Sequence, residues 1–460
     1  MINRFSVITW LILGIWLPMK AQSSLTETLF TEVTVTDVNP GLGSQTLRPL
    51  TYSQCVEQAV TNNPDIRQTI LSILLADQDI LLAKDEWLPS VDFSTSHNFT
   101  NYPSPGDSRD ANTYGSSYGV NASWTVWEGN VRKYRLESAR ILRMQQQLAG
   151  ADQIKELQVA ILQAYLNILY AREAIDIARQ TLEVSTAQTE RARRLVEAGR
   201  SSKVDLAQIE SQRAQDEYSV IQAESSLASY KMTLKRLLAL RLDSEVEVEG
   251  AEFSDTDILS PLPDAENTFL AAAAWLPEIK SNQLNREIYD NDLKIARAGR
   301  LPEISLQGGL GTGYTTGGPP WPAQMGHGFN EHVGVTLSVP IFDANRTRRA
   351  VAKANLNALE YDVNQDRLLN DLSQTIEDLY IQARNARAKY TSGIARLGAA
   401  NQTATLVNRQ FELGLVNPLE LLTAHNNLLN ARLEQLQNKY MAILASKTIG
   451  FYASREVNIP

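Results

Sequence analysis

Few residues in this chain have a type and a spacing that could support chemistry. The sequence of 460 residues contains one cysteine, Cys55, and four histidines, His97, His327, His332 and His425. One thiol cannot form an internal disulfide. Because Cys55 lies in a helical pattern, we interpret it as a small buried apolar side chain. His327 and His332 share a glycine-rich segment and could bind a metal ion, although two loop histidines are more often bystanders.

Four glycines lie close together in the second half of the chain: Gly308, Gly309, Gly311 and Gly313. Their spacing fits neither the dinucleotide-binding pattern nor the P-loop, so we interpret the segment as a glycine-rich strand. Carboxylate pairs such as Asp205 and Glu210 are interpreted as charges on a helix surface. The sequence therefore predicts no catalytic residue, no cofactor and no metal site, and we expect a protein that is not an enzyme.

The N-terminus predicts export from the cytoplasm. Arg4 precedes an apolar stretch over 5–17, and a small residue, Ala21, follows. This pattern is typical of a secretory signal, here 1–22, cut near Ala21 or Gln22. No later segment reaches 18 apolar residues. The net charge of −9 gives no basic patch for nucleic acid, so we expect no nucleic-acid partner.

The chain repeats itself. Leu88-Pro89 recurs as Leu301-Pro302, 213 residues later, and the segment around Gly199 recurs around Gly414 at an offset of 215. A register held over such a distance indicates an internal duplication. We therefore expect a first structural repeat over 51–240 and a second over 266–452. An extended segment (23–50) would precede them, an acidic linker (241–265) would join them and a tail (453–460) would follow.

Each repeat contains a very long predicted helix, over 131–198 and over 345–412. In the first, Ile154, Ile161 and Ile168 fall seven residues apart, and small residues occupy the row between them. A 3.5-residue period indicates coiled-coil packing. At 1.5 Å per residue each helix would be about 100 Å long.

Both long helices should turn back at a glycine. After Gly199, Ser202 and Asp205 form a capping-box pattern, and after Gly414 the Asn417-Pro418 pair begins a helix. The returning helices, 202–240 and 417–452, are too short to cover their partners. We expect the helices over 64–86 and 277–299 to stack on them end to end, after a helix over 51–62.

The remaining segments alternate between apolar and polar residues with period two, which predicts strands. The four strands are 91–102, 118–127, 303–314 and 332–342, with loops over 103–114 and 315–331. They form one hairpin in each repeat, 90–127 and 303–342. Each strand is long enough to cross a membrane when tilted. Four strands leave two open edges, which lipid does not tolerate, so a barrel must close between several chains.

This organisation resembles the TolC-like outer membrane efflux protein family over roughly 51–452. The resemblance rests on Asn62-Asn63-Pro64, Leu88-Pro89, Trp127-Glu128-Gly129-Asn130, the heptad helices and the paired glycine turns. It implies an α+β fold, internally duplicated. Long coiled-coil helices would form a periplasmic α-barrel, and four strands per chain would complete a 12-stranded transmembrane β-barrel in a homotrimer. It also implies outer-membrane lipid, a periplasmic adaptor (membrane fusion) protein and an inner-membrane pump or secretion ATPase as partners.

The resemblance also implies site residues. The periplasmic tip, which meets the adaptor, would contain Arg194, Glu197, Gly199, Arg409, Leu413, Gly414 and Leu415. Glu420 matches the first of two gate aspartates of the family, and Thr423 stands at the second position, so the doubled acidic ring is absent. Simple helix capping explains Glu420 equally well.

Two other functions remain open from the sequence. A periplasmic coiled-coil adaptor or scaffold would have no membrane span, but an adaptor would carry one helical hairpin and no duplication. Recovery in the soluble periplasm would favour this alternative. A duct for secreted protein rather than small molecules would have the same sequence features, and the sequence does not separate the two.

Overall fold

A computed structural model describes residues 49–104, 110–241, 243–455, 457 and 459. The predicted signal (1–22) and all but Pro49 and Leu50 of the segment 23–50 lie outside the described residues. The first half contains α1 (Tyr52–Asn62), α2 (Pro64–Asp85), β1 (Ser90–Asn101), β2 (Asn112–Trp127), α3 (Val131–Glu197) and α4 (Lys203–Leu237). The second half contains α5 (Asp255–Leu259), α6 (Ala265–Trp275), α7 (Pro277–Ala298), β3 (Glu303–Thr315), α8 (Trp321–His327), β4 (Asn330–Ser338), α9 (Arg346–Glu412) and α10 (Pro418–Ser454).

The helix starts follow the residues that the sequence places there. The Thr51 and Ser202 side chains each accept a hydrogen bond from the third backbone N–H of their helix, as predicted for α1 and α4. Asn417 does the same for α10, with Pro418 in the first position. These caps satisfy backbone N–H groups that have no partner inside a helix. The predicted helix starts are therefore confirmed.

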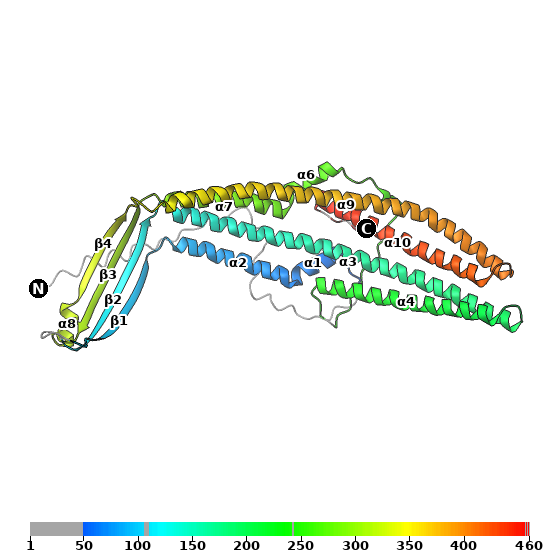
Figure 1. The fold of residues 1–460 in the computed structure, drawn as a ribbon, viewed down its shortest axis with the longest axis horizontal. Helices are drawn as coiled ribbons and strands as arrows, with labels where there is room; N and C mark the ends of the chain where they lie inside the picture. The colour runs from blue at the N-terminus through cyan, green and yellow to red at the C-terminus, as the bar shows by residue number, and fades with distance from the viewer. Residues whose placement is uncertain (1–48, 105–109, 242, 456, 458, 460) are drawn as a thin grey trace. The chain divides into compact units, whose positions relative to one another are not determined.

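Two short helices together line each long one. The 67-residue helix α3 packs against α2 and then α4, and α9, also of 67 residues, packs against α7 and then α10 (Figure 1). Asn63, between α1 and α2, donates from Nδ2 to the Leu237 carbonyl at the end of α4 over 3.5 Å. This contact confirms the predicted end-to-end stacking for the first repeat. The two repeats meet where α3 contacts α7 and α10 and where β2 contacts β3.

The largest buried core lies along α3, around Ile161, Leu162 and Ile168, which have relative exposures of 0%. Ile161 and Ile168 come from the heptad row of the sequence, and Leu162 follows Ile161 directly. Val246 and Val248, in the segment between the repeats, also join this core. Arg172 holds the same segment by donating to the Val248 carbonyl over 2.7 Å and by pairing with Glu247. The segment expected as a plain linker is thus packed against the helices.

The strands form one antiparallel sheet in the order β1-β2-β3-β4, so β1 and β4 are its edges. Val120 on β2 pairs with Phe93 on β1 and with Leu310 on β3. The register shifts between Thr125 and Trp127. Because of this irregularity Trp127, rather than Val126, pairs with Ile304 on β3.

Several predicted bounds were wrong. β2 begins at Asn112 rather than at 118, because residues 112–117 pair with β1 although they alternate weakly. The loop 315–331 contains α8, and Gln324 of that helix closes the turn by bonding Thr315. β4 ends at Ser338, because Pro340 follows and lacks a donor. Residues 241–265 contain the capped helix α5.

Candidate functional site

One face of the sheet is polar and built from small side chains. A row across it contains Asp92, Asn121, Gly309 and His332, one from each strand. Asn121 Nδ2 donates to Asp92 Oδ2 over 3.5 Å and to the Ser94 hydroxyl over 3.3 Å. A Cβ at Gly309 would lie 2.5 Å from the His332 ring and 3.0 Å from Asn121 Oδ1. A larger residue at position 309 would therefore displace the His332 and Asn121 side chains from the positions that they occupy beside Gly309.

The other face is apolar and open. Its exposed members include Val91, Phe93, Val120, Leu310, Val333, Val335 and Leu337. Phe93 and Val333 are 67% and 84% exposed, although they lie in regular strands. In water a face of this kind marks a surface that contacts protein or membrane. The two faces together are those expected of a sheet between lipid and water.

Aromatic side chains gather at both ends of the apolar face. At the loop end, the rings of Tyr114 and Tyr314 lie 6.3 Å apart. At the helix end, Trp124 Nε1 donates to the Trp87 carbonyl over 2.9 Å, and the Arg132 guanidinium lies 5.1 Å from the Trp87 ring centre. From Tyr114 to Trp124 the strand rises by roughly 33 Å at about 3.3 Å per residue. Tilted by about 40°, this spans about 25 Å, the height of a lipid-facing band between aromatic girdles.

The two helical hairpins turn in the same way. Gly199 and Gly414 have φ values of 70° and 73°, the left-handed region that residues with a Cβ adopt at a cost. The N–H of Arg200 bonds the Leu195 carbonyl at 2.8 Å, and that of Leu415 bonds the Gln410 carbonyl at 2.9 Å. Both ends are therefore Schellman motifs, and the glycines are required by the turn itself.

The residues predicted for the tip lie at these turns. Arg194 is in the last turn of α3, and Glu197 is its last residue. Arg409 is in the last turn of α9, while Leu413 and Leu415 flank Gly414 and are each 70% exposed. Two leucine side chains that are this exposed do not contribute to the buried core of the chain.

The two residues predicted for the gate lie at the start of α10. Glu420 is exposed and its N–H bonds Asn417 Oδ1 at 3.0 Å, while its carboxylate accepts from Asn417 Nδ2 at 3.3 Å. Thr423 Oγ1 donates to the Leu419 carbonyl at 2.7 Å. The contacts between Asn417 and Glu420 cap the start of α10, whereas the Thr423 contact is a bond within the helix.

Contacts between the hairpins involve residues that the sequence reasoning missed. Arg191 on α3 donates to the Glu412 carbonyl over 3.0 Å and pairs with its carboxylate at 3.4 Å. Gln188 Nε2 donates to Asn408 Oδ1 over 3.3 Å. A small apolar cluster that includes Ile209 and Phe411 lies beside these contacts. The structure thus joins the two turns into one end of the helical region.

A buried polar pair also links the hairpins. His425 Nε2 on α10 lies 3.0 Å from Asp216 Oδ2 on α4, and the two side chains are 8% and 1% exposed. Burial opposes the charge on Asp216, but hydrogen bonds from His425, Gln212 and Ser185 outweigh it and hold the pKa of that carboxyl below its usual value. Asp216 follows Ile209 by seven residues, and a carboxylate in this buried row is the signal that could have revealed it.

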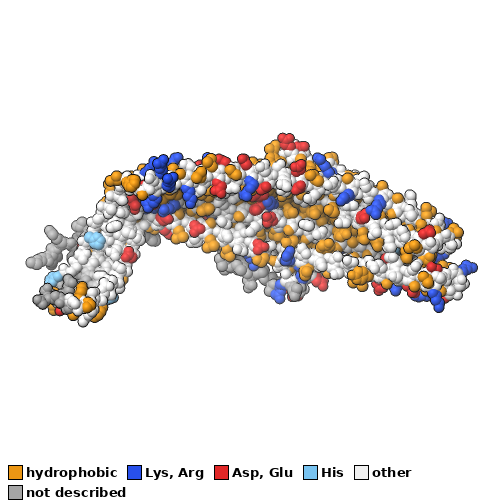
Figure 2. All heavy atoms as spheres, viewed as in Figure 1, with side chains coloured by type: hydrophobic (Ala, Val, Ile, Leu, Met, Phe, Trp, Pro, Cys, Tyr) orange, Lys and Arg blue, Asp and Glu red, His pale blue; other side chains and the backbone are white. Residues whose placement is uncertain are grey.

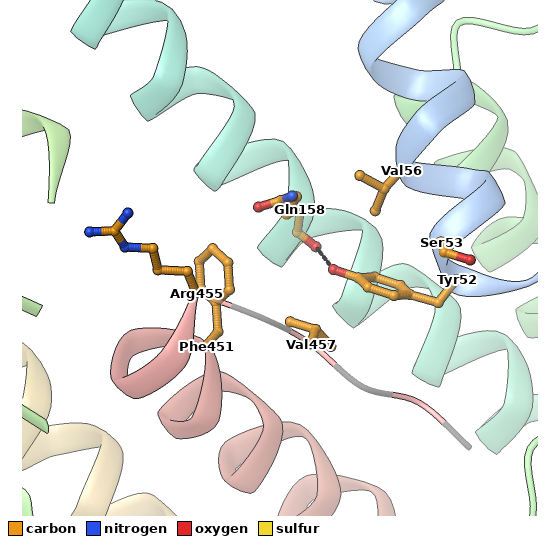
Figure 3. Close-up of a pocket in the computed structure, with 7 residues that line it drawn as sticks. All are labelled: Tyr52, Ser53, Val56, Gln158, Phe451, Arg455 and Val457. Carbon is orange, nitrogen blue, oxygen red and sulfur yellow. Dashed lines mark hydrogen bonds between the residues drawn. The ribbon is translucent and has the colours of Figure 1, made fainter. Parts of the chain in front are cut away.

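The pocket in Figure 3 is not arranged for catalysis. It has a volume of about 410 Å³ and lies between α1, α3 and the end of α10. Tyr52 donates its hydroxyl to the Gln158 carbonyl at 3.2 Å. Burial raises the pKa of Tyr52 to about 12 and that of the nearby Cys55 thiol to about 12, so neither is a nucleophile at neutral pH. Among the described residues no three His, Cys, Asp or Glu side chains are grouped to hold a metal ion.

In the described part of the chain, no helix has the length and apolarity to span a membrane.

Comparison with known proteins gives one consistent result. The model of the family described as outer membrane efflux protein matches residues 55–240 and 271–451. The outer membrane efflux protein BepC of Brucella suis is 21% identical, covering 86% of this chain and 83% of its own. The alkaline protease secretion protein AprF of Pseudomonas aeruginosa is 24% identical, covering 86% and 82%. Crystal structures of CusC, whose description concerns folding and transmembrane channel formation, share the fold with a TM-score of 0.73. The two sequences are 19% identical, and the match covers 87% of this chain and 91% of CusC.

Proposed function

Because this chain belongs to the outer membrane efflux protein family, we propose that it is the exit duct of a tripartite efflux or type I secretion system. In this proposal three copies form one channel, which takes substrate from an inner-membrane pump and periplasmic adaptor to the exterior. The single observation that carries the proposal is the two-faced sheet, which has an exposed apolar face and, within the described residues, two unpaired edges.

The open edges favour assembly from several copies. Among the described residues, β1 and β4 each have one side without a strand partner, and lipid offers no hydrogen bonds to replace one. A cyclic trimer would pair β4 of each copy with β1 of the next, which closes a 12-stranded barrel. The strands have 12, 16, 13 and 9 residues, and a tilted membrane strand needs about 9–11.

The helices have matching edges. α2 exposes Leu71, Leu75 and Leu82, and α9 exposes Leu356, Leu359 and Val363. Each set lies at helical spacing on one side of its helix. Since α2 and α9 are the outer members of the row α2-α3-α7-α9, these stripes would meet between neighbouring copies. The helical region would then enclose a tunnel that continues the barrel.

The joined turns favour a docking role for the tip. Leu413, Leu415 and Leu419 are 70%, 70% and 68% exposed, and among the described residues Arg194 and Arg409 have no ion-pair partner within the chain. We propose that this surface contacts the periplasmic adaptor, with Glu197, Gly199 and Gly414 shaping it. Glu420 and Thr423 would line the narrow end of the tunnel, and of these two residues only Glu420 carries a negative charge.

The proposal is tested with the full chain purified in detergent. We expect a trimer by light scattering, flotation with vesicles and stepwise conductance in planar bilayers. A monomer without conductance would contradict the duct and favour the periplasmic scaffold, which would also appear in the soluble periplasmic fraction.

The tip assignment has its own test. Gly199→Val and Gly414→Val should each reduce export at least tenfold while trimers still form. A Cβ at either glycine meets nothing within 4 Å, so the change strains the left-handed turn, at roughly 1–2 kcal/mol, without disturbing the core. Gly398→Ala on α9, which also has open space around it but helical backbone, is the control. Export is measured with intact cells, and unchanged export in both valine variants would refute the assignment.

The cargo can be a small molecule or a protein. BepC is named for efflux and AprF for protease secretion, and both kinds of relative match this chain over similar lengths. Export assays in cells that express the chain with either a drug pump or a secretion ATPase would decide between them.

A further inference from the structure

Five exposed cations gather where the helices meet the sheet. Arg348, Arg349 and Lys353 lie in the first turns of α9, and Arg297 and Arg300 lie at the end of α7. The two helix ends are in contact, because Thr347 Oγ1 donates to the Gly299 carbonyl over 3.3 Å. Figure 2 shows basic side chains gathered at this end of the helices. We call these five residues the basic collar.

The collar is unusual because, in the described part of the chain, its cations have no acidic partner, and only Arg297 lies in the last turn of a helix, where a cation is favoured. The start of a helix carries a partial positive charge, so cations in the first turns of α9 are unfavourable there. The first acidic residue of α9 is Glu360. Asp343 precedes the helix, but its carboxylate accepts from the Thr347 N–H at 2.8 Å and it faces Arg346. Among the described residues, no acidic side chain lies within 4.0 Å of any collar cation.

The equivalent end of the first repeat differs in this respect. Arg132 on α3 pairs with Glu128 and Arg135 pairs with Glu86, each at 3.4 Å. At the offset of 215, Arg348 matches Lys133, which lies 3.9 Å from Glu137, while Arg349 and Lys353 match the uncharged Tyr134 and Ser138. The duplication therefore provides an internal comparison, in which one copy of the corner has its own counter-ions and the other does not. The missing anions of the second copy should come from outside the chain.

Apolar residues beside the collar indicate which surface supplies those anions. Ile341 and Phe342 are 98% and 83% exposed, and Leu301 is 44% exposed, directly after Arg300. From the sheet toward the helices, the apolar sheet face comes first, these exposed apolar side chains follow, and the cations of the collar come last. The same order is found in a membrane, where hydrocarbon gives way to headgroups.

We infer that the basic collar binds the headgroups of anionic phospholipids in the leaflet on the helix side of the membrane. Phosphate oxygens accept hydrogen bonds from the guanidinium groups, while Ile341 and Phe342 lie among the acyl chains. Each such cation is attracted to an anionic membrane surface. The collar would therefore also fix how deeply the sheet lies in the membrane. This inference rests on the proposed function, which places the sheet in the outer membrane.

The experiment uses the full-length trimer in vesicles that contain brominated lipids, which quench nearby tryptophans. Trp127 pairs with Ile304 at this corner, and Leu301 lies against Gly129. Brominated phosphatidylglycerol should outcompete brominated phosphatidylcholine by about fivefold or more. The triple variant Arg348→Gln, Arg349→Gln, Lys353→Gln should lose most of this preference, as should the wild type at high salt. The control variant Arg367→Gln, Arg384→Gln, Lys389→Gln changes the same charge farther along α9 and should keep it.

Three outcomes would overturn the inference: no preference in the wild type, an unchanged preference in the triple variant, or dissociation of the triple variant into monomers. The last would show that the collar pairs with acidic residues of a neighbouring copy. Conductance in phosphatidylcholine bilayers is recorded for the same samples. A conducting channel without a lipid preference refutes the collar alone, whereas a wild type that neither inserts nor conducts refutes the proposed function.

Discussion

A Val120→Arg chain should fail to assemble in the outer membrane. Val120 lies on the apolar face of β2, between Phe93 on β1 and Leu310 on β3. An arginine facing lipid near the middle of a barrel strand costs about 2–4 kcal/mol. In the proposed trimer, three copies would raise this to roughly 6–12 kcal/mol, which is comparable to the whole stability of many folded domains. We expect the band of the proposed trimer to disappear from outer-membrane fractions on native gels.

The neighbouring residue provides a matched control. Asn121 lies on the polar face of the same strand, 3.5 Å from the Asp92 carboxylate. An Asn121→Arg side chain would therefore point to water and could pair with Asp92. This variant should assemble at close to the wild-type level. Equal assembly of Val120→Arg and Asn121→Arg would contradict the prediction that one face of the sheet contacts lipid and the other contacts water.

An Asp216→Ala chain should lose about 1–3 kcal/mol of stability, because it leaves the buried His425 side chain without its hydrogen-bond partner. Asp216 is 1% exposed and also accepts from Gln212 at 2.9 Å. The pair joins α4 to α10, so we expect the two hairpins to separate more readily near the tip. Thermal unfolding of the detergent-solubilised trimer, followed by circular dichroism, measures the loss.

An exposed pair in the same region serves as the comparison. Arg396 and Glu434 pair between α9 and α10 with side chains 56% and 51% exposed. Glu434→Ala should change stability by less than about 1 kcal/mol. A similar small change for Asp216→Ala would show that the buried pair is not needed to hold the hairpins.

The effect of Asp216 should depend on pH with a definite sign. Its pKa is lower in the folded chain than the usual value of 3.8. A carboxyl of this kind contributes stability above its unfolded pKa and loses the contribution as pH falls through the folded pKa. The difference between wild type and Asp216→Ala should therefore be full near pH 7 and shrink below about pH 4.

The sequence by itself determined the elements, because local physics sets them. Heptad rows, glycines at the turns and capping residues decide where helices run and stop, and alternation decides which face of a strand is apolar. The internal duplication also made Gly199 and Gly414 equivalent positions, since both follow a long heptad helix at the same offset. Family membership follows from the order of these elements. The start of β2 was misplaced and α8 was missed, because residues 112–117 are held by pairing with β1 and α8 is held by the bond between Gln324 and Thr315, and neither contact follows from an alternating or heptad pattern.

Only the tertiary structure decided which residues from separate elements meet. Asp216 and His425 are 209 positions apart, and Arg191 and Glu412 are 221 apart, so no local pattern links them. The basic collar likewise depends on α7 ending beside the start of α9. Local spacing fixes the face on which a side chain lies, but its neighbours depend on how the two repeats pack along α3. The contacts between hairpins and the uncompensated charges could therefore be found only in the folded chain.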